Sequence, residues 1–352
     1  MAGGKGTRFW PLSRADKAKQ FIPITGTSSL LEQTIKRLPH SILKDNIWIL
    51  GNLEQAGFLS DLTLDIPQKQ ILYEPLSRNT AACIGWAAIT LIEKDPDAIM
   101  VVLPSDHIIK EKKNFQSLID HGVEFIKENP EVLLTFGITP QSAHTGYGYI
   151  EVGETMFSTP TPIYSVKQFH EKPDQKTAES YAKKARYFWN SGMFIWKADT
   201  ILSLMKHHMP LHFSILEKIK CIQKGSLYQK ELAFLYKKFE SISIDYGILE
   251  KVSPQIRMIS ADITWSDLGS WSSLKDFWEN DPLKNAKSPL LKKQRILALN
   301  SGSNIVHADK LVALIDVENL VIVDTEDALL IMPKKSDQNV KELYDSLPDE
   351  FK

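Results

Sequence analysis

The sequence predicts an α/β sandwich followed by a smaller all-β unit. In the first part of the chain, short strand-like runs at 47–50, 71–74 and 99–103 alternate with helical patterns, as in a parallel sheet covered on both faces. Composition changes near Asp281, and from residue 296 short apolar runs are separated by turns, with no long helix before about 337. A length of 352 residues suits two domains, which we expect at residues 1–281 and 282–352.

The composition indicates a soluble globular protein of the cytoplasm. A net charge of −1 argues against a nucleic-acid binder, which would need many cations to neutralise phosphates. Cys83 and Cys221 are too few for a disulfide framework and lie in no metal-binding pattern. No apolar run approaches the roughly 18 to 20 residues of a membrane span, and the first residues do not resemble a signal peptide.

The individual elements follow from local patterns. Ser29 with Glu32 forms a capping-box pattern that opens a helix reaching Leu38. Residues 52–62 read as helical, and a long helix is expected from about Asn79 to Glu93. A further buried strand is expected at 132–138, helices within 199–239, and a final helix at about 337–347.

The stretch that organises the chain is residues 2–21, AGGKGTRFWPLSRADKAKQF. Glycine permits sharp turns and leaves room for a ligand against main-chain N–H groups, so this run suits a phosphate cradle with Arg8 and Lys19 nearby. A tight surface turn with solvated cations would use the same residues. The pattern is neither a Walker loop nor a dinucleotide fingerprint, because Phe9 stands where the last glycine of that fingerprint belongs.

Several polar residues stand at the ends of predicted strands. Asp106, in LPSDH after the strand 99–103, is either a helix cap or a cation ligand. In EPLSRNTAA at 74–82, Asn79 or Thr80 would cap the following helix without any ligand. Ligands in such sheets bind beyond the carboxyl ends of the strands.

The second half of the chain offers further candidates, each with a structural alternative. Gly146 and Gly148 in TGYGYIEVG also suit a hairpin turn. Polar residues inside FWNSGMFIW need partners if buried, and structural hydrogen bonds would supply them. In SIDYGILEK, Asp245 and Glu250 would simply cap and flank a helix.

Taken together, GGKGTRFWPLSR, KQF, EPLSRNTAA, LPSDH, TGYGYIEVG, FHEKPD, FWNSGMFIW, SIDYGILEK and WSDLGSW resemble the sugar nucleotidyltransferases. Trp10 before Pro11 is similar to the mannose-1-phosphate guanylyltransferase branch in particular. The resemblance covers nearly the whole chain. It implies a Rossmann-like nucleotidyltransferase sandwich with a small β-helix-like C-terminal unit, which in similar proteins often supports a homodimer.

The resemblance also implies roles for individual residues. Asp106 and Asp267 would hold Mg²⁺, Arg8 would meet the triphosphate and Lys19 the reacting phosphates, so that Arg8, Lys19 and Asp106 form the catalytic set. His170 stands where the family commonly has valine, and we expect it to face away from the site. The nucleotide-binding set would be Ala2, Gly3, Gly4, Gly6, Thr7, Arg8, Glu74, Arg78, Asn79 and Thr80, and the sugar-phosphate set Gly148, Glu171, Lys172, Asn190 and Gly192.

The implied reaction is transfer of GMP from GTP to mannose 1-phosphate. The rivals are a related enzyme of other base or sugar specificity and a non-catalytic homologue that senses nucleotide sugars. Because the sequence stops at Lys352, we expect no cupin-like isomerase domain.

Relatives place a short apolar strand directly before the glycine loop. Here Met1 stands directly against that loop, so a central strand of about 5 to 6 residues is missing. We expect that Met1 is an internal methionine of a slightly longer natural protein, since an open central slot would leave ladder groups unpaired.

Overall fold

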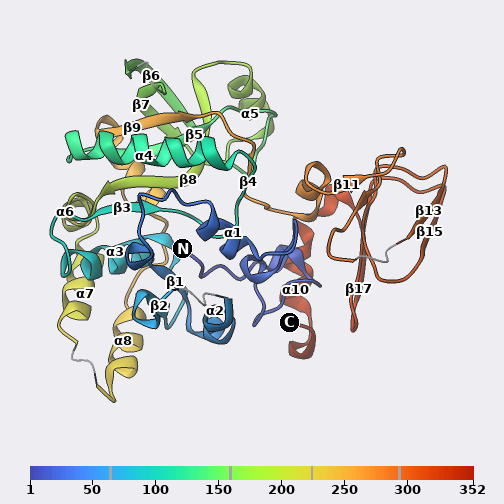
Figure 1. Ribbon diagram of the computed structural model, residues 1–352, viewed down its shortest axis with the longest axis horizontal. Helices are drawn as coiled ribbons and strands as arrows, with labels where there is room; N and C mark the ends of the chain where they lie inside the picture. The colour runs from blue at the N-terminus through green and yellow to red at the C-terminus, as the bar shows by residue number, and fades with distance from the viewer. Residues whose placement is uncertain (63–65, 158–160, 223–224, 292–294) are drawn as a thin grey trace.

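A computed structural model describes residues 1–62, 66–157, 161–222, 225–291 and 295–352. An α/β body carries the first part of the chain, and a strand-rich unit stands beside it, with the last helix, α10 (Asn339–Ser346), next to the N-terminal segments (Figure 1). None of the helices in the described ranges combines the length and the apolar character that crossing a bilayer requires.

The centre of the α/β body is a six-stranded sheet in the order β3-β8-β5-β9-β7-β6, in which β6 also pairs with β8. Its pairing is mixed, because β5 and β9 are parallel whereas β8 is antiparallel to β3, β5 and β6. The strands are β3 (Ile99–Val102), β5 (Leu133–Ile138), β6 (Tyr149–Phe157), β7 (Ile163–His170), β8 (Tyr187–Lys197) and β9 (Ile256–Ala261).

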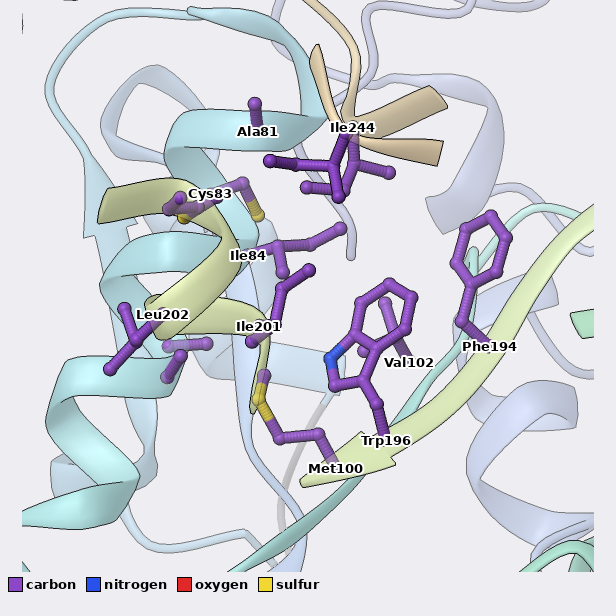
Figure 2. Packing of buried hydrophobic residues seen from close by; sticks show 14 of the residues in the cluster. Ala81, Cys83, Ile84, Met100, Val102, Phe194, Trp196, Ile201, Leu202 and Ile244 are labelled. Carbon is purple, nitrogen blue, oxygen red and sulfur yellow. The ribbon is translucent and has the colours of Figure 1, made fainter. Parts of the chain in front are cut away.

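Helices cover both faces of this sheet. One face packs against α3 (Asn79–Ile92), α6 (Ala198–His208) and α7 (Pro210–Lys220), and Figure 2 shows Trp196 of β8 beside Met100 and Ile201 in this cluster. The other face packs against α4 (Lys112–Glu128), which buries Phe115 and Ile119. The remaining helices are α2 (Ala56–Leu62), α5 (Gln175–Ala182), α8 (Tyr228–Tyr236) and α9 (Ile244–Gly247).

The expectation of a single parallel sheet in the first half is wrong. β1 (Ile49–Asn52) and β2 (Ile71–Glu74) pair in parallel but form a separate sheet. Between β1 and β3 the described chain contributes only Met1 and Ala2, and the other neighbour of β3 is β8, which comes from much later in the sequence. Local patterns could not reveal that long-range partner.

Other expected elements agree with the structure. Helix α1 (Leu30–Lys36) begins after Ser29, whose side chain accepts from the amide of Glu32 while the Glu32 carboxylate accepts from the amide of Ser29, so the capping box is confirmed. β2 matches 71–74, and β1 begins two residues later than the predicted strand.

The C-terminal unit combines parallel strand pairs from successive coils with antiparallel pairs at both edges of its larger sheet. β14 pairs with β16 and β13 with β15 in parallel, and Ile305 lies opposite Val321 just as Ile296 lies opposite Val312. The five-stranded sheet of this unit begins at Glu279, two residues before the end of the first predicted domain at 281. The last two residues of the predicted linker, 292–293, lie outside the described residues. The strands of the C-terminal unit are β11 (Glu279–Asn280), β12 (Ala286–Lys287), β13 (Ile296–Leu299), β14 (Ile305–His307), β15 (Val312–Ile315), β16 (Leu320–Asp324) and β17 (Leu329–Pro333). Outside this unit, β10 (Trp265–Ser266) pairs with β4 (Ile108–Ile109).

Candidate active site

The glycine loop is held from beneath by side chains. The Gln20 amide donates to the carbonyls of Ala2 and Gly4 at 2.7 and 2.9 Å, and Ser13 donates to the carbonyl of Gly6 at 2.8 Å. Gly6 has a φ of 63°, and a Cβ there would lie 2.5 Å from Cβ of Lys19. Glycine is therefore required at position 6, both for the backbone conformation and for the close approach.

The amide groups of this loop are available for a ligand. Within the part of the chain that the structure describes, the amides of Gly3, Gly4, Lys5 and Gly6 donate no hydrogen bond. The side chain of Arg8 is exposed, with only a long contact of 3.4 Å to the carbonyl of Gly269. Free amides beside an arginine suit an anion such as a triphosphate.

Lys19 is a buried cation at the back of this loop, only 6% exposed. Its ammonium donates to the carbonyls of Asp267 and Leu268 at 2.8 and 2.9 Å and pairs with Oδ2 of Asp106 at 2.8 Å. It therefore ties the glycine loop to both segments that carry the predicted metal ligands, although the three residues are far apart in sequence.

Asp106 and Asp267 are each fixed by neighbouring groups. Oδ1 of Asp267 accepts from the hydroxyl of Tyr147 at 2.9 Å and from the amide of Gly269 at 3.0 Å. Oδ1 of Asp106 lies 3.8 Å from Nε2 of His107. Nδ1 of His107 accepts from the indole of Trp265 at 3.2 Å, so Nε2 carries the proton of the neutral ring.

The protonation states follow from burial and charge. Burial by itself would raise the pKa of Asp106, but the charge and hydrogen bond of the Lys19 ammonium, together with His107 and a backbone hydrogen bond, outweigh it, and the pKa lies below its usual range. Burial lowers the pKa of His107 to about 4, although the carboxylates of Asp106 and Asp267 oppose this shift. Burial and the Asp267 carboxylate raise the pKa of Tyr147, so near pH 7 its phenol keeps its proton and remains a donor.

A second group of residues gathers around Gly148. A Cβ at Gly148 would lie 2.5 Å from Oε2 of Glu171, and the carbonyl of Gly148 accepts from the amide of Asn190 at 2.8 Å. The Asn190 side chain donates to Oδ1 of Asp245 at 2.8 Å and accepts from the amide of Gly192 at 3.1 Å. These acceptors and amides suit the hydroxyl groups of a sugar.

The acidic character of this group is marked. Burial raises the pKa of Asp245, and the carboxylate of Glu171 adds to the shift, while the amide of Asn190 opposes it. Glu171 pairs with the exposed ammonium of Lys172 at 3.1 Å. The ammonium of Lys172 is thus exposed beside two carboxylates, those of Glu171 and Asp245, a combination that suits a ligand with both an anionic group and hydroxyls.

Backbone strain accompanies these segments. In the described residues before 282, a left-handed φ occurs at Gly6, Asn79, Lys172, Gly192 and Leu268. All five lie in or next to the predicted site. Such conformations cost free energy in residues other than glycine and cluster where function requires a defined backbone.

The segment around Glu74 is less open than the sequence suggested. Glu74 is only 6% exposed, and burial raises the pKa of its carboxyl to about 7. Its Oε2 would lie 3.1 Å from a Cβ at Gly3, whereas Oε1 has no hydrogen-bond partner among the described residues. Glu74 therefore lies directly behind the glycine loop.

The residues that follow Glu74 are largely occupied. Arg78 donates to the carbonyls of Tyr236 and Lys237 at the end of α8, which is a helix-capping duty. The capping alternative is wrong, because the N-cap of α3 is Arg78 and, among the described residues, the helix has no side-chain cap. Asn79 only accepts from the amide of the adjacent Thr80, and the hydroxyl of Thr80 accepts from the amide of Ile244.

Three structural alternatives can now be decided. The hairpin interpretation of Gly146 and Gly148 is wrong, because β5 and β6 are not neighbours in the sheet. Asp245 does not cap a helix; Ser243 does, by accepting from the amide of Tyr246. His170 contacts Tyr181 and Glu151 rather than the Gly148 group.

Sequence reasoning missed Tyr147 and His107 as supports of the two aspartates. Tyr147 lies 120 positions from Asp267 in the sequence, so no local spacing could link them. The available signal was an aromatic residue between two glycines in TGYGY.

The donor set fits a hard divalent cation. Asp106 and Asp267 both act on the same imidazole, that of His107, so the two carboxylates share one neighbourhood. Among the described residues, no group of three or more His, Cys, Asp and Glu side chains could hold a metal. A cation bound by the two aspartates would take its other ligands from phosphate oxygens and water, as magnesium commonly does.

Comparison with known proteins agrees with this geometry. Residues 1–282 match the nucleotidyl transferase family, and residues 294–347 match the mannose-phosphate isomerase/GMP-like β-helix domain. The chain therefore belongs to the nucleotidyl transferases, an α/β fold with a β-helix-like C-terminal unit.

Individual relatives show which branch of the nucleotidyl transferases the chain resembles. The mannose-1-phosphate guanylyltransferase of Salmonella muenchen is 37% identical, over 99% of this chain and 72% of its own length, and the Escherichia coli enzyme of the same name is 35% identical, over 99% and 73%. A Thermus thermophilus structure described as a mannose-1-phosphate geranyltransferase is 30% identical, with a TM-score of 0.86 over 98% of this chain and 97% of its own. Within the nucleotidyl transferases, this chain is a member of the mannose-1-phosphate guanylyltransferase family.

Proposed function

We propose that this protein transfers GMP from GTP to mannose 1-phosphate, giving GDP-mannose and pyrophosphate. The observation that carries the proposal is that Lys19 joins the free amides of the glycine loop to both aspartates. The names of the relatives supply the base and the sugar.

In the proposed reaction, a phosphate oxygen of mannose 1-phosphate attacks the α-phosphorus of GTP in line. The new oxygen–phosphorus bond forms as the bond from the α-phosphorus to the bridging oxygen breaks, and pyrophosphate leaves with that electron pair. No covalent enzyme intermediate is needed, so the chain's task is to align the reactants and to stabilise negative charge.

The residues divide this task. The amides of the glycine loop and Arg8 bind the triphosphate and the leaving pyrophosphate, and Lys19 stabilises charge at the α-phosphate. Glu171, Asn190 and Gly192 orient the sugar ring, and Lys172 meets its phosphate. Glu74, Asn79 and Thr80 stay our candidates for the guanine side, whereas the Arg78 guanidinium is already bound to the carbonyls at the C-terminal end of α8.

Magnesium is the proposed cofactor. Asp106 and Asp267 would hold it, and when bound it neutralises phosphate charge. Tyr147 and Gly269 orient the Asp267 carboxylate for this purpose, and His107 stays neutral beside Asp106.

The proposal is tested by a substrate panel. Pyrophosphate release is measured with GTP, ATP, UTP and dTTP, each combined with mannose 1-phosphate, glucose 1-phosphate and galactose 1-phosphate. We expect turnover to be fastest with GTP and mannose 1-phosphate. A preference for UTP or dTTP with glucose 1-phosphate would indicate another nucleotidyltransferase. Binding of GDP-mannose without turnover of any pair would indicate a sensor.

We further propose a cytoplasmic location and a homodimer. Cys83 and Cys221 are both free thiols, which suits a reducing compartment. Strands β13 and β15 expose Leu297, Leu299 and Ile315, each at least 60% exposed, on one side of the C-terminal unit. Light scattering across a dilution series measures the oligomeric state.

A further inference from the structure

Arg37 is a buried cation that has no role in the proposed reaction. It is the C-cap residue of α1 and is only 5% exposed. Burial lowers the pKa of its guanidinium to about 10, so the group is still charged near pH 7. Among the described residues Arg37 forms no ion pair. A buried charge without a counter-ion costs a large free energy of desolvation, and forming the short helix α1 does not require one.

The contacts of the guanidinium are all with neutral groups. Its Nη2 donates to the hydroxyl of Thr34 at 2.5 Å and to the carbonyl of His107 at 2.9 Å. The hydroxyl of Thr34 donates in turn to the carbonyl of Leu30, one turn earlier in α1. The Cζ atom of Arg37 lies 5.9 Å from the centre of the Phe115 ring, an arrangement that stabilises a cation. Thr34 and Phe115 thus hold the guanidinium in place, and its free donor points to His107.

The carbonyl of His107 belongs to the residue directly after Asp106. The Asp106 carboxylate favours the charged form of Arg37, although the two groups make no direct contact. Attraction over such a distance is effective in the protein interior, where charges are weakly screened. Arg37 therefore acts on the Asp106 segment in two ways, through one hydrogen bond to its backbone and through its charge.

The segment around Asp106 is held by groups from three distant parts of the chain. Lys19 pairs with the Asp106 carboxylate itself. The indole of Trp265, from β10, donates to the ring of His107. Arg37 binds the backbone of the same residue from α1. The first contact holds the carboxylate, whereas the other two fix the backbone from which it projects.

We propose that Arg37 is a positioning residue for Asp106, whose backbone it fixes so that the carboxylate faces a divalent cation together with Asp267. This inference rests on the proposed function, because the metal role of Asp106 is part of that proposal. Arg37 itself is too deeply buried to touch a substrate. Residues that orient a metal ligand in this way typically change metal affinity or activity by about 10- to 100-fold when they are replaced.

Three variants test the proposal. Arg37→Met removes the charge and the donors but keeps an unbranched side chain. Arg37→Lys keeps a cation and should restore part of the function. The matched control is Arg257→Met, because the guanidinium of Arg257 also donates to two backbone carbonyls, those of Pro254 and Ile256, each at 2.9 Å, outside the site.

The first readout is Mn²⁺ binding in the presence of GTP, measured by electron paramagnetic resonance of the free ion, which needs no turnover. We expect Arg37→Met to weaken Mn²⁺ binding about tenfold, Arg37→Lys to weaken it less, and Arg257→Met to leave it unchanged. Removal of a nearby positive charge would by itself tighten the binding of a cation. A weaker affinity in Arg37→Met therefore reports a displaced ligand rather than a changed electrostatic field.

The second readout separates positioning from general stability. Steady-state kinetics of Arg37→Met should show kcat lowered about tenfold, with the KM values for GTP and mannose 1-phosphate nearly unchanged. In an Asp106→Asn background, Arg37→Met should weaken Mn²⁺ binding little further, because the group that it positions is already altered. If Arg37→Met does not fold, Thr34→Val replaces it, since this change removes the partner of the guanidinium and keeps the charge; a loss of several-fold in Mn²⁺ affinity is then expected.

Three results would overturn the proposal. A lower thermal midpoint for Arg37→Met with normal Mn²⁺ affinity and normal kcat would mean that Arg37 only stabilises α1. The same loss of Mn²⁺ affinity in the Asp106→Asn background as in the unaltered chain would mean that Arg37 acts through another group. Absence of Mn²⁺ binding and of turnover in the unaltered chain would overturn the proposed function, and this inference with it, whereas the first two results would leave the proposed function intact.

Discussion

The substitution Gly148→Ala tests the sugar side of the site, because its effect can be worked out from one contact. An added Cβ would lie 2.5 Å from Oε2 of Glu171 and 3.5 Å from Cβ of Asn190. The first distance is too short for any real contact, and the second is ordinary. The end of the flexible Glu171 side chain must therefore move, while the fold around it can stay in place.

The displaced carboxylate would lose its hydrogen bond to a sugar hydroxyl. A hydrogen bond to a charged group contributes about 1.5–3 kcal/mol, which corresponds to a loss of about ten- to hundredfold in kcat/KM for mannose 1-phosphate. Because the glycine loop is untouched, the KM for GTP should hardly change. Steady-state kinetics with each substrate varied in turn measures both quantities.

Two controls isolate the contact. Gly57→Ala adds the same methyl group in α2, where no atom lies within 4 Å of it, and should leave kinetics unchanged. In a Glu171→Ala background, Gly148→Ala should have almost no further effect, because the group that it displaces is gone. Fully additive losses in the double variant, or a normal kcat/KM for Gly148→Ala, would refute the reasoning.

Three other predictions concern the loop, the metal and pH. Lys19→Ala should lower kcat by about 100-fold or more, whereas the exposed Lys17→Ala should leave it nearly unchanged, and equal losses in the two variants would indicate only a general basic patch. Asp106→Asn and Asp267→Asn should each weaken Mg²⁺ binding, measured by titration calorimetry with GTP present, and should leave the thermal midpoint of unfolding nearly unchanged. An unchanged Mg²⁺ affinity in either variant would exclude that residue as a ligand. Burial raises the pKa of the Glu74 carboxyl to about 7 in the folded protein, against 4.5 ordinarily, so between these values the folded state binds more protons than the unfolded state. The free energy of unfolding should therefore fall as pH rises through this window, by an amount on the order of 3 kcal/mol. Glu74→Gln should flatten this dependence in chemical denaturation at pH 5, 6, 7 and 8, and an identical slope in both proteins would contradict the assignment.

The sequence was most informative where structure depends on neighbouring residues. The capping box of Ser29 and Glu32, the strand at 71–74 and the helix from Asn79 all follow from local chemistry. The glycine at position 6 was likewise predictable, because its conformation and its contact with Lys19 both belong to one short stretch.

Features that depend on distant residues could not be predicted. The antiparallel strand β8 lies beside β3 although nearly a hundred residues separate them, so the mixed sheet had no local signal. Asp245 suited a helix cap in the sequence, and only the folded chain brings Asn190 to its carboxylate. The family resemblance singled out Asp106 and Asp267 as candidate metal ligands, whereas the contacts of Tyr147 and His107 with them became visible only in the structure.

In the C-terminal unit, the repeat becomes visible only in the backbone. Asn300 and Asp316 both have a left-handed φ, as do Ser303 and Asn319, and each pair lies at corresponding corners of successive coils. The Asn304 side chain accepts from the amide of Leu320, so polar side chains connect one coil to the next. Sequence patterns predicted strands and turns here but not their period.

The same unit also completes the catalytic loop. The indole of Trp10 donates to the carbonyl of Phe351 at 2.8 Å, the guanidinium of Arg14 donates to the same carbonyl at 3.0 Å, and the amide of Ala15 donates to the carbonyl of Lys352 at 2.6 Å. Arg14 also pairs with Asp327 at 2.6 Å. Beneath these contacts, Phe9 and Trp10 share one apolar cluster with residues of β14, β16, β17 and α10. A glycine-rich loop has high conformational entropy, and fixing it before the nucleotide arrives lowers the entropic cost of binding. The C-terminal residues therefore hold the segment that follows the glycines in one conformation, which is their part in the proposed site.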